Sequence, residues 1–250
     1  MVVKVGCCGF PKARRKYYES FNLVELQNTF YDLPTVEWAE KLRGEAPEGF
    51  EFTLKAWQVI THPPSSPTWR KMRRKPGGVL DNYGFLKPTR ENLNALEETV
   101  RVAEALKARV IVIQTPPSLP YNEESVKWVR EFFSKASEIA QGFTLAWEPR
   151  GDWSKSREIG EIVEEYGVAH VVDPFRSQPI LGRANLVYFR LHGIGGGEVN
   201  YKYKYKDEDL ARLEGIVAQY SAGRDVYVLF NNVYMFDDAL RFKNKLSKAG

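Results

Sequence analysis

Four side chains that can transfer protons or bind a metal ion lie at or near the ends of short apolar segments. They are Glu25, Glu148, Asp173 and His192. Glu25 and Glu148 could act as general acid and base, or as the nucleophile and acid of a glycoside hydrolase. The same four residues could instead bind Mg²⁺ or Mn²⁺, which prefer oxygen-rich sites. A structural role is equally open, in which Glu148 pairs with Arg150 or Arg190 and merely orders the site.

Residues that could hold a substrate follow the same pattern. Near the segment ends we find Lys55, Trp57, Gln114, Arg150, Trp153, Arg190, Asn231 and Asn232. The two asparagine amides could donate hydrogen bonds to a ligand or cap a helix. Lys55 could form a Schiff base, or it could clamp an anion together with Arg190. A carboxylate beside Lys55 would keep it protonated and favour the clamp. Trp57 and Trp153 either wall a pocket or fill space.

The chain has only three histidines, so a histidine-rich zinc site is not expected. His192 is the best placed of them for acid–base chemistry, and His62, in the motif ITHPP, is the second choice. His170 lies near the start of its segment and is predicted to be structural. Cys7 and Cys8 have no evident base beside them, so we expect small buried residues and not a thiolate nucleophile.

Eight short segments rich in apolar and β-branched residues are predicted to be strands. They are Val2–Cys7, Leu23–Thr29, Phe50–Ala56, Val110–Thr115, Phe143–Glu148, Ala169–Asp173, Leu186–Leu191 and Val226–Asn231. Helical patterns separate most of them. These are Thr35–Leu42, Thr89–Lys107, Glu123–Ala140, Ser156–Tyr166, Asp209–Tyr220 and Asp237–Lys248. No helix is evident after the first or the sixth strand, so irregular connections are expected there.

Eight predicted strands alternate with helices over 250 residues. This pattern predicts an α/β fold, namely a (β/α)8 TIM barrel that forms a single domain over residues 1–250. A doubly wound open sheet is the alternative, but no GxGxxG motif follows the first strand. Active sites of TIM barrels lie at the C-terminal ends of the strands, where the candidate residues fall. Because buried unpaired charges are unfavourable, so many ionisable groups at one end of a barrel predict a functional site.

The composition, with 43% hydrophobic and 27% charged residues, is that of an ordinary globular protein. The only two cysteines are adjacent, which excludes a disulfide framework and favours a reducing, cytoplasmic compartment. No apolar run reaches the roughly 18 residues of a membrane span, and no signal-peptide pattern opens the sequence. We therefore expect no membrane partner.

The net charge of +4 is unremarkable, but two loops concentrate basic residues. The long loop at about 58–88 contains Arg70, Lys71, Arg73, Arg74, Lys75 and Lys87 against one acid, Asp81. The second, Tyr201–Lys206, alternates tyrosine and lysine. Both loops follow predicted strands, so both would rise over the same barrel mouth. They are either solvated loops or a surface that attracts an anionic small molecule or a nucleic acid.

Motifs throughout the chain resemble the DUF72 family, the YecE-like proteins. The matching stretches are GCCGF (6–10), VELQNTFY (24–31), FTLKAWQVITH (52–62), QTPPS (114–118), WEPRGDW (147–153), VDP (172–174), FRLHG (189–193), YKYKDEDL (203–210) and FNN (230–232). They cover the chain in order from end to end. The sequence departs from the family at Cys7–Cys8, where Gly-Thr-Ser-Gly is the more usual pattern. The resemblance implies a TIM barrel, and it implies no particular reaction because the family's function is not established.

Together these features favour a hydrolase that acts on a phosphate-bearing or other anionic substrate, with nucleic acid as the leading large substrate. Glu25 and Glu148 would hold a metal or act as acid and base, and His192 would transfer a proton. Two alternatives remain open. One is a nucleic-acid-binding protein without catalysis, which the basic loops alone would explain. The other is a metal-free carbohydrate hydrolase that uses Glu25 and Glu148.

Overall fold

Eight parallel strands form one closed barrel in chain order in the computed structural model, which describes residues 1–249. The strands are β1 (Val3–Cys8), β2 (Leu23–Leu26), β3 (Glu51–Lys55), β4 (Val110–Gln114), β5 (Thr144–Glu148), β6 (Ala169–Val172), β7 (Leu186–Leu191) and β8 (Asp225–Phe230). Pairing of β1 with β8 closes the barrel. The predicted (β/α)8 fold is confirmed, and the open-sheet alternative is excluded.

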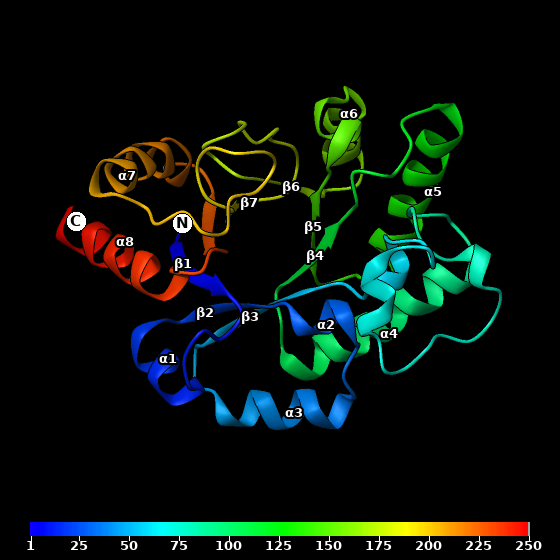
Figure 1. Cartoon of the computed structure of the whole chain (residues 1–250), viewed down its shortest axis with the longest axis horizontal. Helices are drawn as coiled ribbons and strands as arrows, with labels where there is room; N and C mark the ends of the chain where they lie inside the picture. The colour runs from blue at the N-terminus through cyan, green and yellow to red at the C-terminus, as the bar shows by residue number, and fades with distance from the viewer. Residues whose placement is uncertain (250) are drawn as a thin grey trace.

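Helices surround the strands on the outside of the barrel (Figure 1). They are α1 (Arg14–Ser20), α2 (Asn28–Tyr31), α3 (Val36–Glu45), α4 (Arg90–Leu106), α5 (Glu123–Ile139), α6 (Glu158–Glu165), α7 (Asp207–Ser221) and α8 (Met235–Ala249). Short 3-10 turns occur at η1 (Gln58–Ile60), η2 (Pro67–Lys71), η3 (Leu80–Asn82) and η4 (Gly151–Lys155). The side chain of Thr89 caps α4, because its hydroxyl accepts a hydrogen bond from the backbone N–H of Asn92. Within residues 1–249, no helix has the length and apolar character needed to cross a membrane.

Two connections differ from the prediction. The second strand ends at Leu26, before the predicted Thr29, because the Thr29 hydroxyl bonds to the carbonyl oxygens of Leu26 and Lys55 and the chain turns into α2. Helix α1 follows β1, where no helix was evident, and Tyr17 is its one fully buried residue. As expected, the connection between β6 and β7 is irregular.

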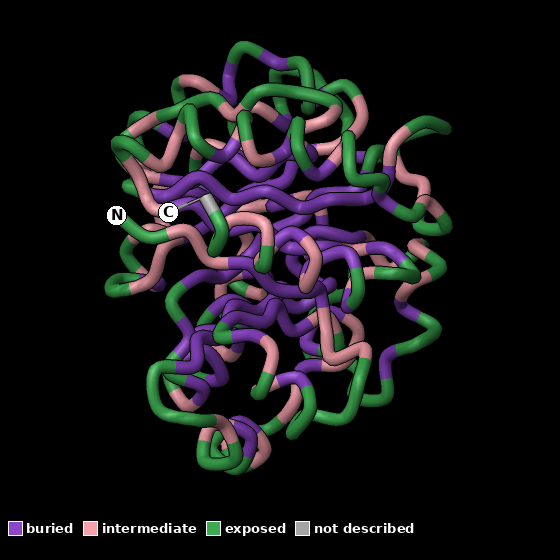
Figure 2. Tube along the Cα trace, turned by 90° about the vertical axis from the view of Figure 1, so that its left-hand side faces the viewer, coloured by how far each residue is buried: buried purple, intermediate pink, exposed green. Residues whose placement is uncertain are grey.

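Buried residues form two layers that the strands separate, and most residues of the strands are themselves buried (Figure 2). The layer inside the barrel includes Val112, Ala146, Tyr188 and Leu229. The larger layer lies between the strands and the helices and includes Trp147. Because successive strand residues face opposite sides, the inward positions beyond the inner layer carry the polar residues of the mouth.

Candidate functional site

Side chains alternate between the inside and the outside of the barrel along each strand, and this alternation places the predicted polar site residues at the barrel mouth. On β7, Tyr188 belongs to the inner layer, so Arg190 and His192 face the same side at the next two inward positions. Gln114 and Glu148 are paired in register at the ends of β4 and β5. The mouth is therefore built from the last inward positions of several strands.

Arg190 is the centre of the site and joins two carboxylates. Its Nη2 atom lies 3.0 Å from Oε1 of Glu25, and its Nη1 atom donates to Oε2 of Glu148. All three side chains are buried. Glu25 also accepts hydrogen bonds from the Tyr188 hydroxyl, at 2.7 Å, and from the Gln27 amide. Glu25 is thus held inside the barrel with both of its oxygens occupied.

Glu148 receives two further cationic or polar neighbours. Arg150 donates to Glu148 Oε1 from Nη2 at 2.8 Å and from Nε at 3.1 Å. The His192 Nε2 atom lies 3.3 Å from the same oxygen. Burial alone would raise the pKa of Glu148, but the charges of Arg190 and Arg150 outweigh it and hold that pKa well below its ordinary value of 4.5. Glu148 is therefore a stable anion and a weak base.

His192 connects this ion pair to the loops above it. Its Nδ1 atom lies 3.2 Å from the Asn231 amide nitrogen, an assignment that places the ring proton on Nε2, toward Glu148. Burial lowers the pKa of His192 although Glu148 opposes the shift, so the imidazole is neutral at neutral pH. The His192 backbone N–H donates to Asp173 at 2.9 Å, and that of Phe175 donates to the other carboxylate oxygen at 3.0 Å. Asp173 thus fastens the end of β7 to the turn after β6.

One cavity, the mouth cavity, has a volume of about 540 Å³. It is lined by Gln27, Phe30, Tyr31, Lys55, His62, Thr68, Gln114, Arg150, Arg190, Tyr201, Asn231, Asn232, Val233 and Met235. Six of the eight predicted substrate-binding residues are in this lining, and Trp57 and Trp153 are not. Lys55, Arg150 and Arg190 are lysine or arginine side chains in this lining, and no aspartate or glutamate belongs to it. Its walls therefore suit an anion.

Lys55 has an unusual environment in this cavity. Its Nζ atom donates to Gln114 Oε1 at 2.6 Å and lies 3.6 Å from the centre of the Phe30 ring. No ion pair joins Lys55 to a carboxylate of residues 1–249, so the contact that would keep it protonated and favour the clamp is not formed. Burial, followed by the positive charges of Arg190 and Arg150, lowers the pKa of Lys55 to about 7.

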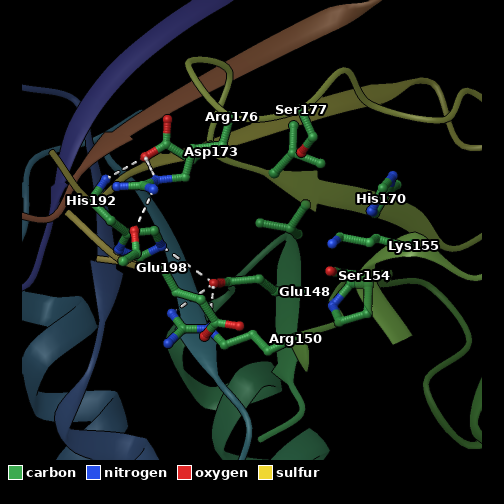
Figure 3. Close-up of a pocket in the computed structure, with 14 residues that line it drawn as sticks. Glu148, Arg150, Ser154, Lys155, His170, Asp173, Arg176, Ser177, His192 and Glu198 are labelled. Carbon is green, nitrogen blue, oxygen red and sulfur yellow. Dashed lines mark hydrogen bonds and ion pairs between the residues drawn. The ribbon is translucent and has the colours of Figure 1, made fainter. Parts of the chain in front are cut away.

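A second cavity, the side pocket, has a volume of about 420 Å³ and lies where β5 and β6 separate beyond Trp147 and His170. Figure 3 shows Asp173, Arg176 and His192 on one side of it and Ser154, Lys155 and His170 on the other. Arg150 lines both cavities.

His170, expected to be structural, does line the side pocket. Its Nδ1 atom accepts the Ile180 N–H at 3.0 Å, and burial lowers its pKa to about 4. The hydrogen bond fixes the ring, so His170 both holds the β6–β7 connection and forms part of the pocket wall.

The predicted metal site does not assemble as expected. Among residues 1–249, no group of three or more histidine, cysteine, aspartate or glutamate side chains is arranged to hold a metal ion. The guanidinium of Arg190 lies between Glu25 and Glu148, and Asp173 is engaged by two backbone N–H groups. Positive charge already occupies the position that a cation would need.

The two predicted tryptophans fill space and do not wall a cavity. Trp57 is 1% exposed and follows the end of β3, and the guanidinium of Arg74 lies 4.9 Å from its ring. Trp153 is fully buried, packs against Trp147, and donates from Nε1 to the Pro120 carbonyl at 2.7 Å. Both belong to the layer between barrel and helices.

The long basic loop borders the mouth cavity at His62 and Thr68. Several of its charges have local partners. Arg74 pairs with Glu98, Lys71 lies 4.6 Å from the Tyr31 ring, and Lys75 donates to the Trp69 carbonyl. Arg70 and Arg73 are exposed, and neither forms an ion pair within the described chain. Tyr201, from the second basic loop, lines the same cavity.

Sequence reasoning missed residues that come from irregular segments. Gln27, Phe30 and Tyr31 reach the mouth cavity because the chain leaves β2 early and forms α2. Lys155, Arg176 and Glu198 reach the side pocket from turns. Their positions depend on loop conformation, for which the alternation of apolar residues carries no signal.

Comparison with known proteins gives a family and no activity. A family model described as protein of unknown function DUF72 matches residues 10–250. A solved DUF72 family protein from Thermotoga maritima is 24% identical, with a TM-score of 0.70 over 99% of this chain and 100% of that chain. Another, from Enterococcus faecalis, is 21% identical, with a TM-score of 0.75 over 98% of each chain. No curated protein matches this chain.

The barrel is also similar to more distant structures. A xylose isomerase domain containing protein from Salmonella typhimurium is 15% identical, with a TM-score of 0.58 over 98% of this chain and 97% of that one. At such identity the similarity concerns the fold alone, a TIM barrel.

Proposed function

We propose that this protein, which belongs to the DUF72 family, is an enzyme that binds a small phosphate- or carboxylate-bearing molecule in the mouth cavity and acts on it there. One observation carries the proposal. The cavity is lined by Lys55, Arg150 and Arg190 and by no carboxylate. The carboxylates that pair with the two arginines, Glu25 and Glu148, do not line the cavity, so a ligand there meets cationic hydrogen-bond donors and no anionic group.

The size of the cavity supports a small substrate. A volume of about 540 Å³ lies in the range of small-molecule sites, which is roughly 300–1,000 Å³. Arg150 is the side chain best suited to bind the anion, because its planar guanidinium lines the cavity and remains 16% exposed. Gln114 and Asn231 offer amide groups beside it. Arg190 contributes less, because two carboxylates already neutralise it.

Hydrolysis, the reaction class predicted from the sequence, needs a base that takes a proton from water. Glu148 is ill suited to that task because Arg190 and Arg150 lower its pKa. Lys55 is the better candidate, since it lines the mouth cavity and burial lowers its pKa to about 7, close to the working pH. A pair of catalytic carboxylates, as in the carbohydrate-hydrolase alternative, finds no support, because Glu25 is fully buried and lines neither cavity.

Anion binding tests the proposal directly. We would titrate inorganic phosphate and pyruvate into the protein at low salt by calorimetry, beside Arg150→Gln. Loss of a charge-assisted hydrogen bond of about 1.5–3 kcal/mol should weaken binding by roughly ten- to a hundredfold. The matched control is Arg157→Gln, which removes an arginine that is 89% exposed and should leave binding unchanged. Absence of binding, or equal weakening by both variants, would contradict the proposal.

Nucleic acid is a second candidate ligand, favoured by the exposed Arg70 and Arg73 on the loop beside the mouth. It predicts oligonucleotide binding that weakens steeply with salt. Fluorescence anisotropy at low and physiological salt, with the double variant Arg70→Gln/Arg73→Gln, distinguishes it from small-anion binding. Cleavage assays with Mg²⁺, Mn²⁺ or EDTA beside Glu148→Gln would separate a nuclease from a binding protein.

A further inference from the structure

Of the lysine and arginine side chains that line the mouth cavity, Lys55 alone is not paired with a carboxylate of residues 1–249. Arg150 and Arg190 both donate to Glu148, whereas Lys55 donates to the neutral amide oxygen of Gln114 at 2.6 Å. The aromatic ring of Phe30 covers the amine at 3.6 Å. Lys55 is 6% exposed, and that exposure is toward the cavity it lines. Burial removes water from the ammonium form of Lys55, and the Phe30 ring face and the Gln114 oxygen compensate only part of that loss.

The charged groups around Lys55 reinforce this effect. Arg190 and Arg150 disfavour a further positive charge, while Glu148 and Glu25 favour it, and the balance leaves the pKa of Lys55 at about 7. His62, which lines the same cavity, is also disfavoured as a cation because of burial and of Lys55. A large fraction of Lys55 is therefore a neutral amine at neutral pH, which is the nucleophilic form.

We propose that Lys55 forms an imine with the carbonyl carbon of its substrate, so that the substrates are small anionic aldehydes or ketones, namely 2-oxo acids or phosphorylated carbonyl compounds. This inference rests on the proposed function, because Arg150 holds the anionic group in the cavity that Lys55 lines. It adds the carbonyl group as the second recognition element.

The chemistry needs no oxidant or reductant. The lone pair of Lys55 Nζ forms a bond to the carbonyl carbon, and the carbonyl π bond breaks to give a carbinolamine. The carbonyl oxygen then leaves as water after it gains two protons, one from the amine and one from the solvent. The resulting protonated imine withdraws electrons from the adjacent carbon, and later hydrolysis takes up water and restores the amine.

Reductive trapping tests the inference. The intact protein is incubated at pH 7.5 with pyruvate, glyoxylate or glyceraldehyde 3-phosphate in the presence of sodium cyanoborohydride, and the modified lysines are located by peptide mass spectrometry. An ordinary lysine is neutral in only roughly one molecule in a thousand at this pH. Lys55 should therefore be modified at least about tenfold faster than the exposed Lys135, which serves as an internal reference.

Two controls complete the experiment. Lys55→Arg and Lys55→Met should show no preferential adduct, with folding checked by circular dichroism. Inorganic phosphate should slow the trapping of wild-type Lys55, a comparison that needs no variant. Modification of Lys55 no faster than that of Lys135, with all three carbonyl compounds, overturns the imine. If phosphate still binds through Arg150 in that case, the proposed function stands without it, whereas absence of both signals overturns both.

Discussion

The guanidinium of Arg190 and the carboxylate of Glu148 form an ion pair inside the barrel, where the two side chains are 1% and 9% exposed. Burial of two charges is unfavourable unless each finds its partners. Here the partners are abundant, because Arg190 also bonds to Glu25 and Glu148 also bonds to Arg150. The cluster is thus electrically balanced without any bound ligand, and Lys55 is left as the group whose charge can change.

We expect Arg190→Met to lower the free energy of unfolding by about 3–5 kcal/mol, since removal of one partner leaves buried carboxylates without a cation. Guanidinium chloride unfolding at neutral pH measures this loss. The double variant Arg190→Met/Glu25→Gln should recover part of it, because the second change removes the stranded charge. Lys135→Ala, which breaks the exposed pair with Glu131, is the control and should cost less than about 1 kcal/mol. A loss below about 1 kcal/mol for Arg190→Met would show that the cluster is not stabilising.

Because the pKa of Glu148 is lowered in the folded protein, the free energy of unfolding should depend on pH in the acidic range. A carboxyl whose pKa is lower in the folded chain than its ordinary 4.5 stabilises the fold above that value, and the stabilisation disappears as pH falls toward the folded pKa. Wild-type stability should therefore fall between pH 4.5 and about pH 3 more steeply than that of Glu148→Gln. Urea unfolding at a series of pH values gives both slopes. Equal slopes would mean that Glu148 titrates in the folded protein as it does in the unfolded chain.

The strands were predictable because buried parallel strands are continuous apolar runs, and all eight observed strands overlap the predicted ones. The mouth residues were predictable as far as the alternation continues. The alternation of inward and outward side chains stops at Lys55, where β3 ends. The side chain of Trp57 therefore lies in the outer layer and not in the mouth. The partners of Arg190 come from β2 and β5, and no local pattern in β7 indicates which acids will meet it.

Trp153 tests the distinction between packing and binding. We expect Trp153→Phe to destabilise the protein by about 1–3 kcal/mol, because it leaves a cavity beside Trp147 and removes the hydrogen bond to the Pro120 carbonyl. Phosphate affinity should stay within about twofold of wild type, in contrast to Arg150→Gln. Chemical denaturation and calorimetry on the same preparations measure the two effects. A tenfold loss of phosphate affinity with little loss of stability would instead show that Trp153 takes part in ligand binding.

The ionisation of Lys55 can be observed directly. Reductive methylation with ¹³C-formaldehyde labels lysine amines, and the chemical shift of each dimethyl-lysine reports its protonation. One resonance, absent from Lys55→Arg, should titrate near pH 7, because burial and the charges of Arg190 and Arg150 oppose the ammonium form.

Phosphate provides the second half of this experiment. A bound anion stabilises the ammonium form, so added phosphate should raise the midpoint of the Lys55 resonance. Arg150→Gln should weaken the response to phosphate, since Arg150 holds the anion in the same cavity. If Lys55 titrates near pH 10 with and without phosphate, the amine is an ordinary cation, and it would serve as an anion clamp without a nucleophilic role.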